Sequence, residues 1–153
     1  MKIKSFVLFS SVAVATTACT HVSTNFTRLD QSVRLAPTCP NAVRLYTGPG
    51  GVEQPYREVA LINSTGDVTL SDEGDMFGSM RKAAARVGAN GVILGGIDEP
   101  NAITKVAADV AKTTAVRKGK AMAIYVPADS AHNAATCADY KAPSWLHRVL
   151  IGA

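Results

Sequence analysis

The hydrophobic and polar positions of this chain first indicate two short strands. Residues 43–46 (VRLY) alternate apolar and polar side chains with a period of two, and a glycine-rich stretch, residues 48–51, follows them. Residues 56–62 (YREVALI) alternate in the same way, with Val59 and Leu61 on one face. Alternation bounded by turn residues is typical of half-buried strands. The pattern therefore predicts two strands, which could pair as neighbours.

The strongest local pattern is a helical one over residues 75–87. Its apolar residues recur at spacings of three and four and form one stripe: Met76, Phe77, Met80, Ala83, Ala84 and Val87. Residues 63–74 (NSTGDVTLSDEG) precede it and predict a turn that ends in acidic residues. Carboxylates at this position meet the positive end of the helix dipole, and Gly88 or Gly91 provides a left-handed stop. The alanines favour close packing of this helix against a sheet.

Two further strands follow the helix. Residues 92–94 (VIL) form a continuous apolar run, and Gly95 and Gly96 after it indicate a bulge or a close backbone approach. Residues 121–126 (AMAIYV) predict another strand. Between these runs, residues 101–115 favour a helix, although their valines and threonines also fit an extended hairpin arm.

These elements together predict one α/β domain of the α+β type. We expect a small antiparallel sheet of about four strands with one main helix on one face, in the order β-β-α-β-(α)-β. The domain is expected to span residues 39–127. The rest, residues 128–153, reads as a loop-like tail that contains one short amphipathic segment, residues 144–151.

The first residues have the pattern of an export signal. Lys2 and Lys4 precede eleven uncharged residues, 5–15, which are too few to span a bilayer, since about 20 are needed. Small residues then lead to Cys19, so residues 1–18 are expected to be a lipoprotein signal peptide and Cys19 the lipidated residue. Position −3 is Thr16, where leucine is usual. The alternative is ordinary signal-peptidase cleavage after Ala18 or Ala15.

The residues after Cys19 predict how the protein is held. Residues 20–37 are polar and weakly patterned, as in a tether, so residues 19–38 are expected to form the lipidated cysteine and its tether. Thr20 follows the cysteine instead of the aspartate that favours inner-membrane retention. We therefore expect a lipid-anchored protein of the outer membrane that faces the periplasm.

An odd number of cysteines in an exported protein requires an explanation. The chain has three cysteines. If Cys19 carries lipid, Cys39 and Cys137 remain to form a disulfide in an oxidising compartment. That bridge would close a loop of nearly 100 residues and stabilise the fold by about 4–5 kcal/mol in the chain-entropy description. The alternative is two unpaired thiols in flexible tails.

Charge and motifs do not indicate an enzyme or a nucleic-acid-binding protein. Loss of Lys2 and Lys4 with the signal lowers the formal net charge from +4 to +2, and no run of five like charges occurs. His132 and His147 could complete a zinc set with Cys39 and Cys137, but their spacing matches no compact zinc motif. Nucleophile-elbow, zinc-protease and phosphate-loop motifs are absent from the sequence. We expect no catalytic residues, no metal ligands and no cofactor.

The order of elements resembles a group of small exported lipoproteins related to the Rcs stress-sensing outer-membrane lipoprotein. It also resembles the short β-β-α-β-β domains of the heavy-metal-binding family. The resemblance covers residues 42–127 and rests on residues 43–46, on residues 55–59 (PYREV) and on residues 83–94 with their Gly-Ala-Asn turn. It implies a sensing or interaction role in the envelope.

Two departures limit this resemblance. The stress sensor holds its domain with two internal disulfides and has a long proline-rich tether, whereas this chain has no cysteine between Cys39 and Cys137. Signalling to the Rcs phosphorelay is therefore not implied, and no ligands match the heavy-metal group. The expected function is a non-catalytic interaction, stress-sensing or structural module of the envelope, anchored in the outer membrane, with another envelope protein as its possible partner. The alternative is a soluble periplasmic or secreted ligand-binding protein or enzyme.

Overall fold

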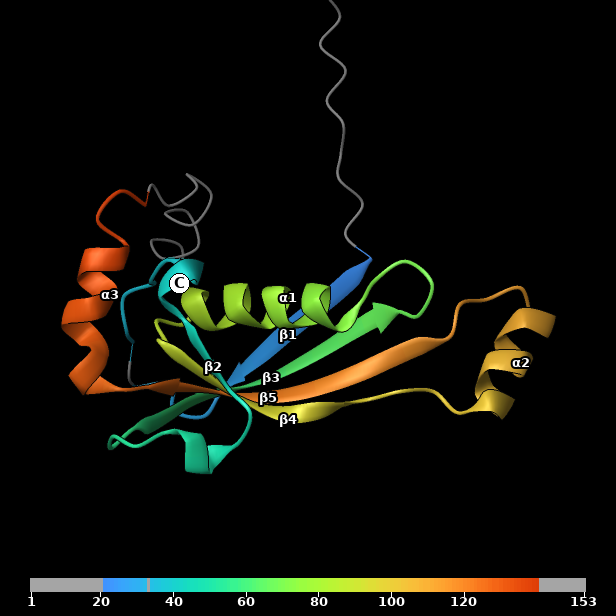
Figure 1. The fold of residues 1–153 in the computed structure, drawn as a ribbon, viewed down its shortest axis with the longest axis horizontal. Coiled ribbons are helices and arrows are strands. Elements are labelled where there is room, and N and C mark those ends of the chain that lie inside the picture. The colour runs from blue at the N-terminus through green and yellow to red at the C-terminus, as the bar shows by residue number, and fades with distance from the viewer. Residues whose placement is uncertain (1–20, 33, 141–153) are drawn as a thin grey trace, which may run out of the picture.

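The computed structural model describes residues 21–32 and 34–140, which form one five-stranded sheet with helices on its face and at its ends (Figure 1). The strands lie in the order β1-β3-β5-β4-β2. The elements are β1 (Val22–Arg28), η1 (Pro40–Ala42), β2 (Arg44–Tyr46), η2 (Pro49–Gly51), β3 (Arg57–Asp67), α1 (Glu73–Arg86), β4 (Gly91–Asp98), α2 (Ala102–Val110), β5 (Val116–Tyr125), η3 (Pro127–Asp129) and α3 (Ser130–Thr136). The expected α+β class with one main helix is confirmed.

The sheet is mixed and not purely antiparallel. The pairs β1·β3, β3·β5 and β4·β5 are antiparallel, but β2 pairs with β4 in parallel. The expected pairing of β2 with β3 is therefore wrong. The Arg44 amide donates to the Asn90 carbonyl at 3.0 Å, so β2 enters the sheet beside the start of β4. Strand β2 forms the edge of the sheet opposite β1.

The expected tether is also corrected, because residues 22–28 of it form β1. This strand pairs with β3 along its full length, from Val22 opposite Gly66 to Arg28 opposite Ala60. Polar and β-branched residues (VSTNFTR) suit an edge strand that is exposed on one face. The described domain therefore begins well before Cys39.

Strand β3 is longer than the sequence pattern predicts. Residues 63–67 continue the strand in place of the expected turn, with Ser64 and Gly66 buried beneath α1 and Asn63 and Thr65 exposed on the opposite face. The buried positions take small residues because α1 crosses there. A methyl group on Gly66 would lie 3.1 Å from the Met76 sulfur.

Helix α1 forms the core with the covered face of the sheet. Its first turn is closed by a reciprocal capping box, in which the Asp75 amide donates to the Asp72 carboxylate at 2.8 Å and the Asp72 amide donates to the Asp75 carboxylate at 3.1 Å. Met76 and Met80 are fully buried. Met80 packs over Gly119 of β5, where a larger residue would collide with its methyl group.

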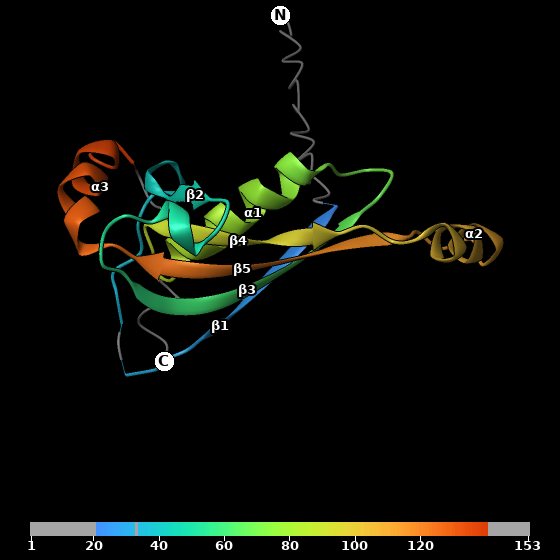
Figure 2. The same ribbon diagram turned by 60° about the horizontal axis from the view of Figure 1, so that its bottom comes forward.

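The segment between β4 and β5 contains a helix and also closes a hairpin. The favoured helix is confirmed as α2, while β4 and β5 pair from Gly91 opposite Ile124 to Asp98 opposite Lys118. The register shifts between Leu94 and Ile97, which confirms the bulge expected at the glycines. Helix α2 extends beyond the sheet at one end (Figure 2).

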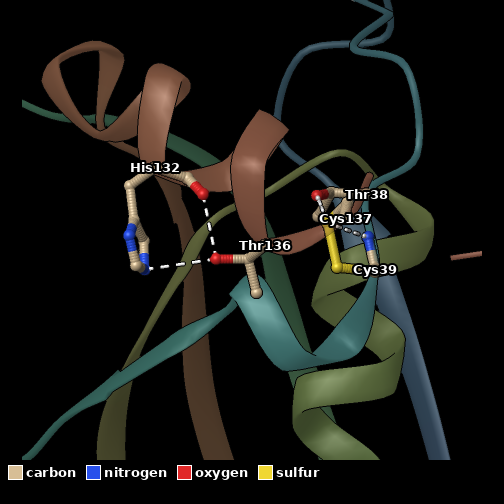
Figure 3. Close-up of a disulfide and its surroundings, with 5 residues drawn as sticks. All are labelled: Thr38, Cys39, His132, Thr136 and Cys137. Atoms are coloured by element: carbon tan, nitrogen blue, oxygen red, sulfur yellow. Dashed lines mark hydrogen bonds between the residues drawn. A yellow bond between two sulfur atoms is a disulfide. The ribbon is translucent and has the colours of Figure 1, made fainter. Parts of the chain in front are cut away.

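The chain after β5 contains η3 and α3. The loop-like tail expected from the sequence is therefore wrong for these residues. This segment is held by two hydrogen bonds between Asn90 and the backbone of Val126, at 2.8 and 2.7 Å. The expected disulfide is present: Cys39 and Cys137 are bonded with Cα atoms 5.5 Å apart and join α3 to the segment before η1 (Figure 3). The amphipathic segment expected at residues 144–151 lies outside the described residues.

The turn after α1 provides a test of the core geometry. Gly88 has φ +79°, and a Cβ atom there would lie 2.6 Å from the Ala36 carbonyl oxygen. Gly88→Ala should therefore lower the free energy of unfolding by at least about 2 kcal/mol in denaturant titration. Gly78→Ala is the matched control, because a Cβ there contacts nothing within 4 Å in the helix interior and should stabilise by about 0.5–1 kcal/mol. Equal stability of the two variants would contradict this packing.

Candidate functional site

A polar groove lies between the first strand and the main helix. It has a volume of about 740 Å³ and is lined on one side by β1 and on the other by the exposed flank of α1. The helix flank contributes small residues, Gly74, Gly78 and Ser79, together with three exposed charged residues, Asp75, Lys82 and Arg86. These small side chains leave room beside β1 for another chain segment.

A chain of hydroxyl groups fixes β1 beneath α1. The Ser79 hydroxyl donates to Thr24 Oγ1 at 2.7 Å, and Thr24 Oγ1 lies 2.8 Å from the buried Ser64 Oγ. The three residues come from α1, β1 and β3. The chain therefore satisfies polar groups at the base of the groove and sets the distance between the strand and the helix.

The outer edge of β1 has no neighbouring strand among the described residues. The Asp67 amide donates to the His21 carbonyl at 3.2 Å, and the Leu29 amide donates to the Val59 carbonyl at 3.0 Å, so both ends of the strand share one register. In an antiparallel pair, alternate residues then bond the partner. Residues 23, 25 and 27 direct their amides and carbonyls toward β3, and residues 22, 24, 26 and 28 direct theirs outward.

This edge lacks the usual protection against pairing. Edge strands are commonly blocked by proline, bulges or several charges, whereas β1 is seven residues long and regular, contains no proline and has one charged residue, Arg28. An extended chain laid along it would gain backbone hydrogen bonds on one side and contact with α1 on the other. The arrangement is chemically suited to binding peptide backbone.

The turn at the end of β3 is held by Asp67. Its carboxylate accepts from the Thr69 amide at 2.8 Å and from the Thr69 hydroxyl at 2.6 Å. These hydrogen bonds, with the hydroxyl as the larger contribution, lower the pKa of Asp67 below its ordinary value. The two hydrogen bonds therefore favour the ionised carboxylate, which joins Asp67 to Thr69 in this turn.

The cysteines predicted from the sequence lie in different places. Cys39 and Cys137 meet near the C-terminal end of α1, where the Thr38 amide donates to the Ala85 carbonyl at 2.9 Å. We call this the disulfide end; it lies at the left of Figure 1. Cys19 is outside the described residues, but it precedes Val22 by three residues, a separation of at most about 10 Å.

Val22 begins its strand at the opposite end of the sheet. It pairs with Gly66, which in turn pairs with Arg117 near the start of β5. This is where β4 and β5 connect to α2, at the right of Figure 1, and we call it the hairpin end. The chain that follows Cys19 therefore enters the sheet at the hairpin end.

The zinc set considered from the sequence does not assemble among the residues that the structure describes. Both sulfurs of the considered zinc set are bonded to each other, so neither is a thiolate ligand. His132 Nε2 lies 3.5 Å from the Thr136 hydroxyl oxygen, and both residues belong to α3. Figure 3 draws this contact. His147 lies outside the described residues. Across residues 21–32 and 34–140, no three His, Cys, Asp or Glu side chains form a metal-binding group, and no helix is long and apolar enough to span a membrane.

Comparison with known proteins assigns no family. No protein-family model matches the chain, and no curated protein matches it. A crystal structure of the Francisella virulence factor FvfA is similar, with 17% sequence identity and a TM-score of 0.47, and the match covers 67% of this chain and 96% of that one. The function must therefore be argued from the residues of this chain.

The sequence patterns did not identify the groove or the free edge. The signal that could have found them is the alternation of Val22, Thr24 and Phe26 with smaller polar residues, which places three larger side chains on one face. The hydroxyl chain combines residues that are distant in sequence. Only the register of β1 on β3 brings them together.

Proposed function

We propose that this protein is a non-catalytic envelope lipoprotein that binds an extended segment of another envelope protein by strand addition to β1. The lipid is carried by Cys19 and holds the protein in the outer membrane, facing the periplasm. The observation that supports strand addition most directly is the unprotected edge of β1 beside the groove. The envelope address rests on the lipoprotein-like leader and on the cysteine count.

The position of β1 sets where such a partner would bind. Only Thr20 and His21 separate Cys19 from the strand, so the edge lies within about 10 Å of the lipidated residue along the chain. A long tether would let the domain search the periplasm. Here the bound segment must come close to the membrane surface, which favours a partner that is itself attached to the membrane.

The groove also limits the side chains of the bound segment. Alternate residues of an added strand would face α1, where Gly74, Gly78 and Ser79 leave space for small side chains. Lys82 provides a positive charge for an acidic group at the same wall. We therefore expect an extended segment with small or acidic residues at every second position.

This assignment accords with the interaction or sensing role that the resemblance to stress-sensing lipoproteins implies. The hydroxyl chain of Ser64, Thr24 and Ser79 is assigned a structural role, because each oxygen is occupied in joining three elements. A hydroxyl used in this way is not presented to a substrate. The groove is thus proposed as a binding surface and not as an active site.

Strand addition can be tested with two substitutions at one position. A photo-crosslinking residue at Leu70, which lines the groove and is 56% exposed, should trap a partner in cells. Phe26→Ala should keep that adduct because the amide of residue 26 still faces outward. Phe26→Pro removes this amide but none of the hydrogen bonds to β3. The yield of the crosslinked adduct should therefore fall at least about tenfold, because one buried hydrogen bond and the local fit of the added strand are lost. Circular dichroism checks that both variants remain folded. An adduct that persists in folded Phe26→Pro would exclude strand addition.

The lipid anchor has a separate test. Cells grown with a clickable palmitate should label the protein, and Cys19→Ala should abolish the label while the Cys39–Cys137 disulfide remains. The measurement is in-gel fluorescence after immunoprecipitation. No label on the unaltered chain, or equal label on the variant, would favour cleavage by the ordinary signal peptidase and a soluble protein.

A further inference from the structure

Helix α2 presents an apolar stripe to solvent. Ile103, Val106 and Val110 follow a helical spacing of three and four residues and are 80%, 64% and 80% exposed. They include the most exposed large hydrophobic side chains among the described residues. Isolated apolar residues on a surface are ordinary, but three aligned on one short helix form a contact surface.

The helix is not held in place by burying this stripe on its own domain. None of its residues is buried, and it lies apart from the rest of the molecule in both ribbon views (Figures 1 and 2). Thr104, Ala107 and Ala108, on another face of the helix, line a hollow of about 610 Å³ toward the hairpin strands. The apolar stripe is therefore available to another surface.

Local contacts fix α2 to the hairpin. The Asn101 side chain caps its first turn by accepting from the Thr104 amide at 2.8 Å. Glu99, just before the helix, pairs with Arg117 of β5 at 2.6 Å and with Lys105 of α2 at 3.9 Å. The helix thus keeps a defined place at the hairpin end.

The same end of the sheet receives the chain from Cys19. Val22 and Arg117 are two strand spacings apart, about 10 Å, since both pair with Gly66. Cys19 lies at most about 10 Å from Val22, and α2 is about 13 Å long. Helix α2 begins at Ala102, four residues and at most about 14 Å after Asp98, which pairs with Lys118 next to Arg117. A lipid on Cys19 and the stripe of α2 can therefore reach one planar surface.

We propose that α2 lies on the bilayer surface that holds the lipid of Cys19, with Ile103, Val106 and Val110 in the interfacial layer. This inference rests on the lipid anchor of the proposed function. A second attachment point would orient the domain on the membrane, with the disulfide end directed away from it. Short amphipathic helices of this kind bind the interface through their apolar face.

A bilayer fits the stripe better than a protein does. A specific protein interface buries about 800 Å² on each partner, far more than three aliphatic side chains on a nine-residue helix provide. Contact with the membrane needs no such area, because the lipid already holds the helix near the surface and makes its insertion an intramolecular step.

The experiment uses a tryptophan probe and a chemical anchor. The chain from residue 19 onward contains every described residue, and Cys19 is its one free thiol because Cys39 and Cys137 are bonded to each other. Coupling Cys19 to a maleimide lipid attaches the protein to vesicles of phosphatidylethanolamine and phosphatidylglycerol that contain a brominated phosphatidylcholine.

The probes are tryptophan variants. In a Trp145→Phe background, which removes the single native tryptophan, Val106→Trp probes α2. Leu61→Trp, on the open face of the sheet away from the hairpin end, is the matched control.

We expect the fluorescence of Val106→Trp to be quenched several-fold more than that of Leu61→Trp. Equal quenching, or none, would overturn the membrane contact. A blue shift of Val106→Trp that grows with protein concentration without vesicles would also overturn it, because the stripe would then be buried in a second copy. The anchor is chemical, so a missing palmitate label in cells would refute the proposed lipidation without changing this readout.

Discussion

The antiparallel pairing of β1 with β3 is the constraint on which the functional account depends. It fixes the first described residues to the sheet, with Val22 opposite Gly66. One consequence is that a lipid on Cys19 would hold the domain directly at a membrane. Another is that the outer amides and carbonyls of β1 form a free edge beside α1. Without this pairing, residues 20–37 would be the tether that their composition suggests, and there would be neither an edge nor a groove.

The two ends of the sheet have different roles in this arrangement. At the disulfide end, the Cys39–Cys137 bond and the hydrogen bonds of Asn90 hold the chain after β5 against the core. A cross-link over this loop stabilises the fold by about 4–5 kcal/mol in the chain-entropy description. At the hairpin end, exposed side chains and an unburied helix predominate. The stable end supports the domain, and the other end is where contacts with a membrane and a partner are proposed.

The sequence predicts elements whose burial follows a simple period and fails where polar residues are buried or the partners are distant. The stripe of Met76, Met80 and Ala83 gives α1 directly, and the cysteine count leads to the disulfide. By contrast, β3 extends through Ser64, a polar residue that is buried under α1 with its hydroxyl 2.8 Å from Thr24 Oγ1. The first strand mixes apolar and polar residues on its inner face and is polar on the other, so its place depends on the register with β3. The parallel pairing of β2 depends on contacts that no local pattern contains.

Amide hydrogen exchange across β1 tests this account most directly. The chain from residue 19 with Cys19→Ser can be studied by nuclear magnetic resonance in solution. The register predicts slow exchange at Ser23, Asn25 and Thr27, whose amides bond to β3, and fast exchange at Thr24, Phe26 and Arg28, whose amides face outward. Uniformly fast exchange from residue 22 to residue 28 would show that this segment is a tether after all and would contradict the account.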